Sequence, residues 1–139
     1  MIPFHETKFR VRYAETDQWG AVYHSNFFIW FEVGRVELLR SMGFSYKEME
    51  EQDESHTVVV DVKCSYEKPA RYDDVIRVRT WVSESNTRTL RFAYEVFNDE
   101  TGARLARGET LHVICDRQGR PKALPEKYRA RIPITPRAE

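Results

Sequence analysis

Alternation of apolar and polar side chains is the dominant pattern of the second half of the chain. From His56 onward, four runs place an apolar residue at nearly every second position, which predicts strands with two unlike faces. The repeating positions are Val58, Val60, Val62, Cys64 and Tyr66; Ile76, Val78, Thr80 and Val82; Leu90, Phe92, Tyr94 and Val96; and, more weakly, Leu105, Glu109, Leu111, Val113 and Cys115. Turn-like stretches at residues 69–74, 84–87 and 98–102 separate the runs, so an antiparallel sheet is expected. A looser alternation predicts a further strand at residues 4–13.

A long helix is predicted over Asn26–Met42, where apolar residues recur at the helical period. Ser25 or Asn26 can cap its start, and Gly43 ends it. Its apolar stripe consists of Phe27, Phe31, Leu38 and Met42, widened by Phe28, Trp30 and Leu39. The first two turns are apolar nearly all round, so we expect burial on more than one side. Gly34 costs about 1 kcal/mol against alanine in a helix, which indicates a close packing contact there.

The order of these elements predicts an α+β fold. A strand, a long apolar helix and four more strands fit a curved antiparallel sheet of about five strands wrapped around the helix, because one flat face could not cover such a helix. A shorter polar helix is expected over Ser45–Gln52. The length of 139 residues is that of a single domain, residues 1–139, and four prolines predict an extended C-terminal tail from about residue 121 to 139.

Composition narrows the possible partners. Lys plus Arg number 22 and Asp plus Glu number 22, so the formal net charge is zero, which disfavours nucleic acid and leaves open only a local basic patch. No stretch approaches the ~20 apolar residues of a membrane span, and the N-terminus lacks a secretion pattern. Cys64 and Cys115 have no CxxC spacing, and the histidines have no metal-ligand spacing. We therefore expect a cytoplasmic protein with no metal and no cofactor.

The residues with the most chemical potential lie just before the long helix. Asp17, Gly20 and His24 precede a helix start, where free backbone N–H groups and the helix dipole can stabilise negative charge on a carbonyl oxygen. Asp17 is then placed to act as a base or a nucleophile. Each residue also has a commoner structural interpretation: a turn aspartate, a turn glycine and a helix-terminal histidine. Spacing alone does not decide between the two.

The extended string around these residues resembles a known family. Residues 16–27 contain the motif TDxxGxVYHxxF, and residues 31–37 contain FExxRxE. Together with residues 69–76, they are similar to the hotdog-fold acyl-CoA thioesterases, in the branch of 4-hydroxybenzoyl-CoA thioesterase and the Tol-Pal-associated short-chain thioesterases. The resemblance spans roughly Phe4 to Cys115. It implies the hotdog fold, in which a curved antiparallel sheet wraps a central helix.

The resemblance also implies a mechanism. Asp17 matches the catalytic carboxylate, which either attacks the thioester carbonyl or activates a water. Backbone N–H groups around Tyr23 and His24 would hold the carbonyl oxygen at the helix N-terminus, and the His24 side chain would help to position the oxygen or the water. Coenzyme A is a good leaving group as a thiolate, so no metal or cofactor is implied.

Further roles follow from the same resemblance. Arg88 matches a basic loop that meets the phosphates of coenzyme A, although an exposed hairpin arginine is an equal alternative. Glu32, Arg35 and Glu37 are interpreted as structural support, with an i,i+3 ion pair between Glu32 and Arg35. The implied assembly is a homodimer as the minimal active unit, and a homotetramer is expected.

Three alternatives to an acyl-CoA thioesterase stay open. The same site could hydrolyse acyl groups on acyl carrier protein, or the chain could bind acyl-CoA without catalysis, or it could act as a scaffold. The acyl group, aliphatic or aromatic, depends on which aromatic side chains line the pocket. The residues considered are Trp19, Phe27, Phe28, Trp30 and Tyr46.

Overall fold

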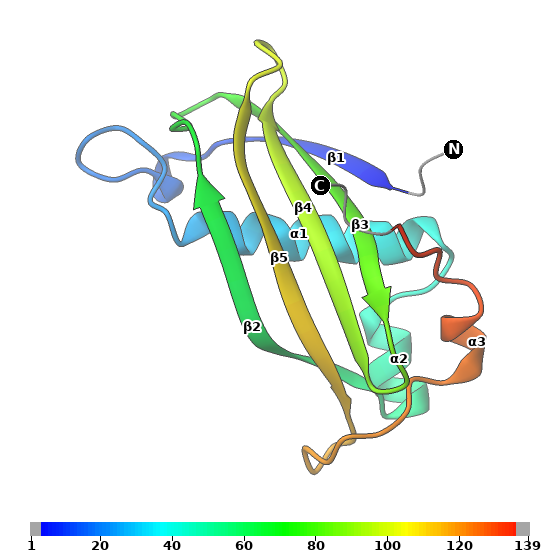
Figure 1. Cartoon of the computed structure of the whole chain (residues 1–139). Coiled ribbons are helices and arrows are strands. Elements are labelled where there is room, and N and C mark those ends of the chain that lie inside the picture. Colours follow the sequence, from blue (N-terminus) through cyan, green and yellow to red (C-terminus); the bar gives the residue numbers. More distant parts are fainter. Residues whose placement is uncertain (1–3, 136–139) are drawn as a thin grey trace.

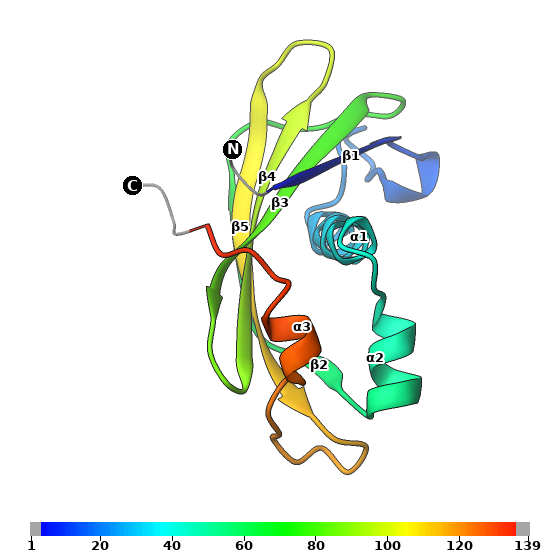
Figure 2. The same cartoon turned by 90° about the vertical axis from the view of Figure 1, so that its right-hand side faces the viewer.

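A single curved sheet wraps around one long helix in the computed structural model, which describes residues 4–135 (Figures 1 and 2). The elements are β1 (His5–Arg10), a 3₁₀ turn (Tyr13–Glu15), α1 (Asn26–Ser41), α2 (Tyr46–Asp53), β2 (His56–Tyr66), β3 (Val75–Ser85), β4 (Thr89–Asn98), β5 (Arg104–Cys115) and α3 (Glu126–Arg129). The five strands are antiparallel neighbours in the order β1-β3-β4-β5-β2. The expected arrangement of a helix within a curved sheet is confirmed.

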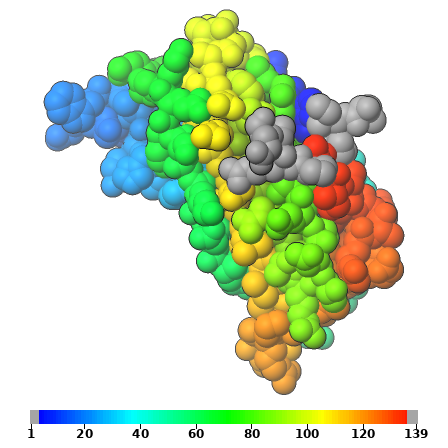
Figure 3. Space-filling model, in the orientation of Figure 1, coloured from blue at the N-terminus to red at the C-terminus, as the bar shows by residue number. Residues whose placement is uncertain are grey.

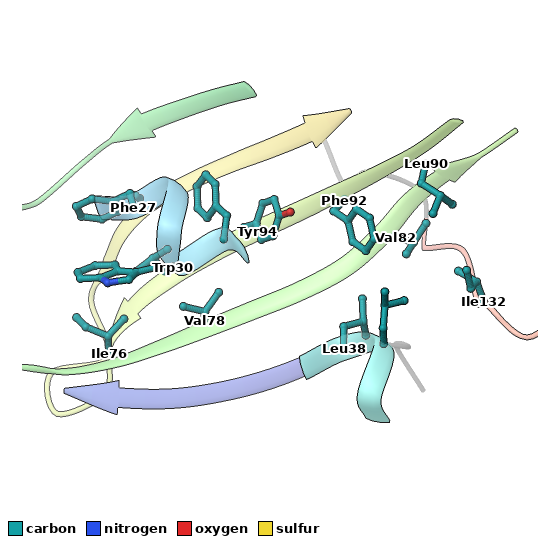
Figure 4. Packing of buried hydrophobic residues seen from close by; sticks show 14 of the residues in the cluster. Phe27, Trp30, Leu38, Ile76, Val78, Val82, Leu90, Phe92, Tyr94 and Ile132 are labelled. Atoms are coloured by element: carbon teal, nitrogen blue, oxygen red, sulfur yellow. The ribbon is translucent and has the colours of Figure 1, made fainter. Parts of the chain in front are cut away.

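The core lies between α1 and the central strands (Figure 4). All inner positions predicted for β3 and β4 are buried: Ile76, Val78, Thr80, Val82, Leu90, Phe92, Tyr94 and Val96. On α1, the predicted stripe is buried at Phe27, Trp30, Phe31, Leu38 and Leu39. Phe28, Ile29 and Val33 of the same helix remain exposed. The expected burial of the first two turns on more than one side is therefore incomplete in a single chain, because the face with Phe28, Ile29 and Val33 is not covered by the sheet.

Two glycines let α1 approach the sheet closely. A Cβ atom on Gly34 would collide with Oγ1 of Thr80 and lie 3.0 Å from Cγ1 of Val78. On the facing strand, a Cβ atom on Gly108 would lie 2.7 Å from the ring of Phe31. The close contact expected at Gly34 is confirmed, and a second one exists at Gly108.

The face assignment of β2 differs from the prediction because of a β-bulge. The register with β5 shifts between Val59 and Asp61, which leaves Val60 as the extra residue. A bulge exchanges the faces of the residues before and after it, so Val59 joins Val62 on the inner side rather than Val58 and Val60. Because β2 is also an edge strand, most of its residues are exposed.

The weak pattern on β5 predicted the wrong inner face. The residues that oppose the buried side of β4 are Ala106, Gly108, Thr110 and His112. These side chains are small or polar, so they give no apolar alternation. They are nevertheless buried or close to it, because Phe31 covers Gly108 and hydrogen bonds pair Thr110 with His112.

The first strand and the segment after residue 120 are both less extended than predicted. The first strand stops at Arg10 rather than Tyr13, since Tyr13–Glu15 turns into a 3₁₀ helix. The segment after residue 120 contains α3 and buries Leu124, Tyr128 and Ile132 against the core. These apolar residues are spaced four apart, and their burial holds the segment against the core despite its prolines. Residues 136–139 of the predicted tail lie outside the described residues.

Substitution of Gly34 by Ala should destabilise the protein. Crowding against Thr80 and Val78 should lower the free energy of unfolding by about 1–3 kcal/mol, although alanine favours helices by about 1 kcal/mol. Urea unfolding of Gly34→Ala, with Lys47→Ala as an exposed helix control, measures this. Adding Thr80→Ala should restore part of the loss, because it removes the colliding hydroxyl. An unfolding free energy at or above that of the unaltered protein would contradict the close contact.

Candidate active site

A short loop before α1 carries Asp17. An isolated bridge joins Thr16 to Val22, and the N–H of Asp17 donates to the carbonyl of Ala21 at 2.8 Å. Gly20 adopts a φ of +81°, which this turn requires and glycine tolerates. The N–H of Val22 donates to the carbonyl of Ala70 at 2.8 Å, which attaches the loop to the segment before β3. Figure 3 shows this part of the chain projecting from the side of the molecule.

The Asp17 carboxylate has one engaged oxygen. Its Oδ1 accepts hydrogen bonds from the N–H groups of Trp19 at 2.9 Å and Ala21 at 3.3 Å. The turn interpretation of Asp17 is therefore correct for this oxygen. Within residues 4–135, no hydrogen bond to Oδ2 is found, so this oxygen is available for chemistry.

Glu15 joins the loop to the helix, a role that the sequence analysis missed. Its carboxylate is buried, with 4% exposure, and accepts from the Arg12 N–H at 2.9 Å and from Nε1–H of Trp30 at 2.8 Å. Its backbone carbonyl accepts from the Tyr23 N–H at 2.8 Å and from the Asn26 amide at 2.9 Å. Its sequence position does not distinguish Glu15 from an exposed turn carboxylate. The tertiary contact with Trp30 does.

The free backbone donors at the start of α1 are shifted by one residue from the prediction. The Tyr23 N–H is engaged by Glu15 and cannot hold a substrate oxygen. The N–H groups of His24 and Ser25 have no acceptor in the described part of the chain. Ser25 occupies the N-cap position without a side-chain hydrogen bond, so the expected cap is absent. The N–H groups of the first helical residues, Asn26, Phe27 and Phe28, donate instead to the carbonyls three residues before them.

A cavity of about 330 Å³ opens beside these donors. Its walls are Val22, His24, Phe27, Tyr66, Glu67, Lys68 and Pro69. Burial raises the pKa of the Tyr66 hydroxyl, which stays protonated and donates to the His24 carbonyl at 2.9 Å. Of the predicted site residues, only His24 lines this cavity. Asp17 and Tyr23 belong to the same loop but not to the cavity wall.

Arg88 lies far from Asp17 within one chain. The Asp17 loop meets the segment before β3, whereas Arg88 follows the end of that strand. Eleven strand residues separate the two ends, which corresponds to roughly 35 Å. Arg88 and Asp17 of the same chain are therefore not parts of one site.

The charged residues of α1 do not pair as expected. Glu37 forms an ion pair with Arg40, whereas none of the ion pairs found within residues 4–135 includes Arg35.

In the described residues, 4–135, no group of three or more His, Cys, Asp or Glu side chains is arranged to hold a metal ion. None of the described helices is long and apolar enough to cross a membrane.

Comparison with known proteins identifies the family. A model of the Thioesterase-like superfamily matches residues 11–132. The chain is 38% identical over 108 residues to a putative acyl-CoA thioesterase of Bacillus subtilis, YneP, covering 78% of this chain and 77% of that one. It is 32% identical over 123 residues to the acyl-CoA thioesterase YbgC of Haemophilus influenzae, covering 87% and 88%.

Solved structures agree with the sequence comparison. A DHNA-CoA thioesterase from Staphylococcus aureus superposes with a TM-score of 0.85 at 33% identity, over 91% of this chain and 85% of that one. The chain therefore belongs to the Thioesterase-like superfamily. The expectations of a hotdog fold and of a thioester hydrolase are confirmed.

Replacement of Glu15 by Gln should loosen the loop that carries Asp17. A glutamine side chain has only one acceptor oxygen for the two donors, so one buried hydrogen bond is lost, at a cost of about 1–3 kcal/mol in unfolding free energy. Turnover of a thioester should fall as well, because the loop is then held to α1 by fewer hydrogen bonds. Unfolding and thiol-release assays measure both effects, with the exposed Glu51→Gln as control. Equal stability and turnover in Glu15→Gln would refute the role of Glu15.

Proposed function

We propose that this chain hydrolyses acyl-coenzyme A thioesters to a free carboxylic acid and coenzyme A. The observation that carries the proposal is the pair of open N–H groups of His24 and Ser25 at the start of α1, next to the loop that carries Asp17. Donors aimed at a developing oxyanion are usually the largest single contribution to acyl-transfer catalysis. The named activities of the relatives from Bacillus subtilis and Haemophilus influenzae support the same conclusion.

In the proposed reaction, the thioester oxygen binds to the His24 and Ser25 N–H groups. Negative charge that develops on this oxygen is further stabilised by the dipole of α1. The open Oδ2 of Asp17 attacks the carbonyl carbon or removes a proton from an attacking water. The carbon–sulfur bond breaks, coenzyme A leaves as the thiolate and takes up a proton, and water supplies the second oxygen of the acid.

His24 contributes to the site in two ways under this proposal. Its N–H binds the oxygen, and its imidazole lines the cavity, with the ring centre 6.2 Å from that of Tyr66. The hydrogen bond from the Tyr66 hydroxyl to the His24 carbonyl fixes the peptide from which this side chain extends. The imidazole is thereby held where it can orient the oxygen or the water.

Replacement of Asp17 by Asn should lower turnover at least ~100-fold, the usual scale for such a group. Asparagine keeps an oxygen that can accept the Trp19 and Ala21 N–H groups, so the loop and the fold should persist. Thiol release from a panel of aliphatic and aromatic acyl-CoAs, and from an acyl carrier protein ester, measures the loss and identifies the carrier. Asp116→Asn, in an exposed turn remote from α1, is the matched control. Near-complete activity of Asp17→Asn would refute the mechanism.

We further propose a homodimer as the active unit. Val58, Val59, Val60 and Val62 are exposed on the edge strand β2, and Phe28, Ile29 and Val33 are exposed on α1. An exposed apolar edge strand invites pairing with another strand, and an apolar patch of this kind marks an interface. A second copy that pairs through β2 would cover both sets. Further assembly to a homotetramer stays a prediction.

The dimer would give Arg88 its role. If the two α1 helices run antiparallel, the β3–β4 turn of one chain approaches the Asp17 loop of the other, where Arg88 can bind a phosphate of coenzyme A.

We place the reaction in the cytoplasm, because Cys64 and Cys115 are both free thiols, as is typical of reducing compartments.

Arg88→Ala should raise KM for acyl-CoA and leave kcat nearly unchanged, because the phosphate contact is remote from the reacting carbon. Mixing the Arg88→Ala and Asp17→Asn chains should restore activity at low substrate concentration, since one site of the mixed dimer then has both unaltered residues. The measurement is the initial rate against acyl-CoA before and after subunit exchange. No gain over the mean of the separate variants would show that the two residues do not share a site.

A further inference from the structure

A second cavity lies farther along α1. It has a volume of about 260 Å³ and is lined by Phe28, Ile29, Glu32 and Arg35 of α1, Val59 and Val62 of β2, and Thr110 of β5. Val59, Val62 and Tyr66 are on the same side of β2, since their partners on β5 are His112, Thr110 and Ala106. Tyr66 lines the first cavity. Both cavities therefore lie along one groove between α1 and β2.

The wall of this second cavity contains an arginine that forms no close ion pair with the described residues. Arg35 is half-buried, yet no ion pair of the chain between residues 4 and 135 includes it. Burial disfavours its charge, but the hydroxyls of Tyr94 and Tyr46 and the Glu32 carboxylate together raise the pKa of Arg35 above its usual value. A guanidinium has five N–H donors, so these hydroxyls leave donors free for a ligand.

The groups that interact with Arg35 from β4 and β5 are buried and uncharged. Tyr94 stacks on Phe31 with ring centres 4.2 Å apart, and its hydroxyl shares a hydrogen bond of 2.6 Å with Thr110. Thr110 in turn shares a hydrogen bond of 2.8 Å with Nε2 of His112. Burial lowers the pKa of His112 to about 4, so the ring is neutral near neutral pH. Among the residues that line the cavity, Arg35 and Glu32 are the two with acidic or basic side chains.

A cationic donor and an anionic acceptor in one small cavity select a particular chemistry. A carboxylate would bind Arg35 but be repelled by Glu32, and an alkyl end would displace water from both groups without replacing its hydrogen bonds. A hydroxyl group satisfies both, because it accepts one hydrogen bond and donates another.

We propose that this cavity binds a hydroxyl group at the far end of the acyl chain, with Arg35 donating to its oxygen and Glu32 accepting its hydrogen bond. This subsite rests on the proposed function, which places the thioester at His24. About 16 Å of helix axis separate His24 from Arg35, and side chains lean toward the helix N-terminus. The hydroxyl therefore lies roughly 10 Å from the bound carbonyl, which suits an acyl chain of medium length with a terminal hydroxyl.

Calorimetric titration with thioether analogues tests the subsite without requiring hydrolysis. S-decyl-CoA and S-(10-hydroxydecyl)-CoA differ only in the terminal hydroxyl, and S-(9-carboxynonyl)-CoA replaces it with a carboxylate. The hydroxyl analogue should bind the unaltered protein at least about tenfold more tightly than either of the others. In Arg35→Met and in Glu32→Gln, the dissociation constants of the hydroxyl and alkyl analogues should become nearly equal. Arg40→Met, on the same helix and paired with Glu37, should keep the preference for the hydroxyl analogue.

Equal dissociation constants for the hydroxyl and alkyl analogues, a tighter carboxylate analogue, or absence of binding would each overturn the subsite. A preference that persists in both Arg35→Met and Glu32→Gln would overturn it too. Glu32 is exposed, so Glu32→Gln should fold even if Arg35→Met does not. Failure of the proposed function would appear separately, as the absence of thiol release from every ester while the thioethers still bind.

Discussion

The close approach of α1 to the sheet is the contact on which the rest of the structure depends. Gly34 lies against Thr80 and Val78, and Phe31 lies over Gly108, with no room for a Cβ atom at either glycine. Because the helix is fixed at these two points, its first turn has a defined position relative to the loop before it. Glu15 then holds that loop to Trp30 of the same helix. The open N–H groups of His24 and Ser25 and the carboxylate of Asp17 are consequently placed by packing that occurs several residues away.

The other side of α1 has no comparable cover. The helix contacts β1, β3 and β4, while both cavities lie between the helix and β2. Because the sheet covers α1 only in part, one apolar face of the helix and the edge strand β2 stay exposed. The inner face of β5 on this side carries polar groups. Under the proposals above, the groove would receive the acyl chain and a second copy would close it.

Local patterns predicted the elements well and the faces of two strands badly. The period-two runs of β3 and β4 identify their buried residues because both strands are central and covered by α1. The bulge at Val60 reverses the faces of β2 before it, whereas Val62, Cys64 and Tyr66 keep the predicted side. No residue type in that run of valines marks the bulge. The sequence pattern does not reveal which face of β5 points to the core, because glycine, threonine and histidine occupy that face and give no apolar alternation. Their burial depends on Phe31 and on partners in β4, which are distant in sequence.

At the site, the sequence by itself determined which segment is the candidate for the chemistry: an aspartate, a glycine and a histidine directly before an apolar helix. It also determined the fold class, since the order and periods of the elements leave few arrangements. Only the tertiary structure decided which atoms are open. The Tyr23 N–H is engaged and that of His24 is not, because a buried carbonyl of Glu15 reaches the former. Hydrogen-bond partners and burial come from contacts between distant segments, and a pattern along the chain contains no record of them.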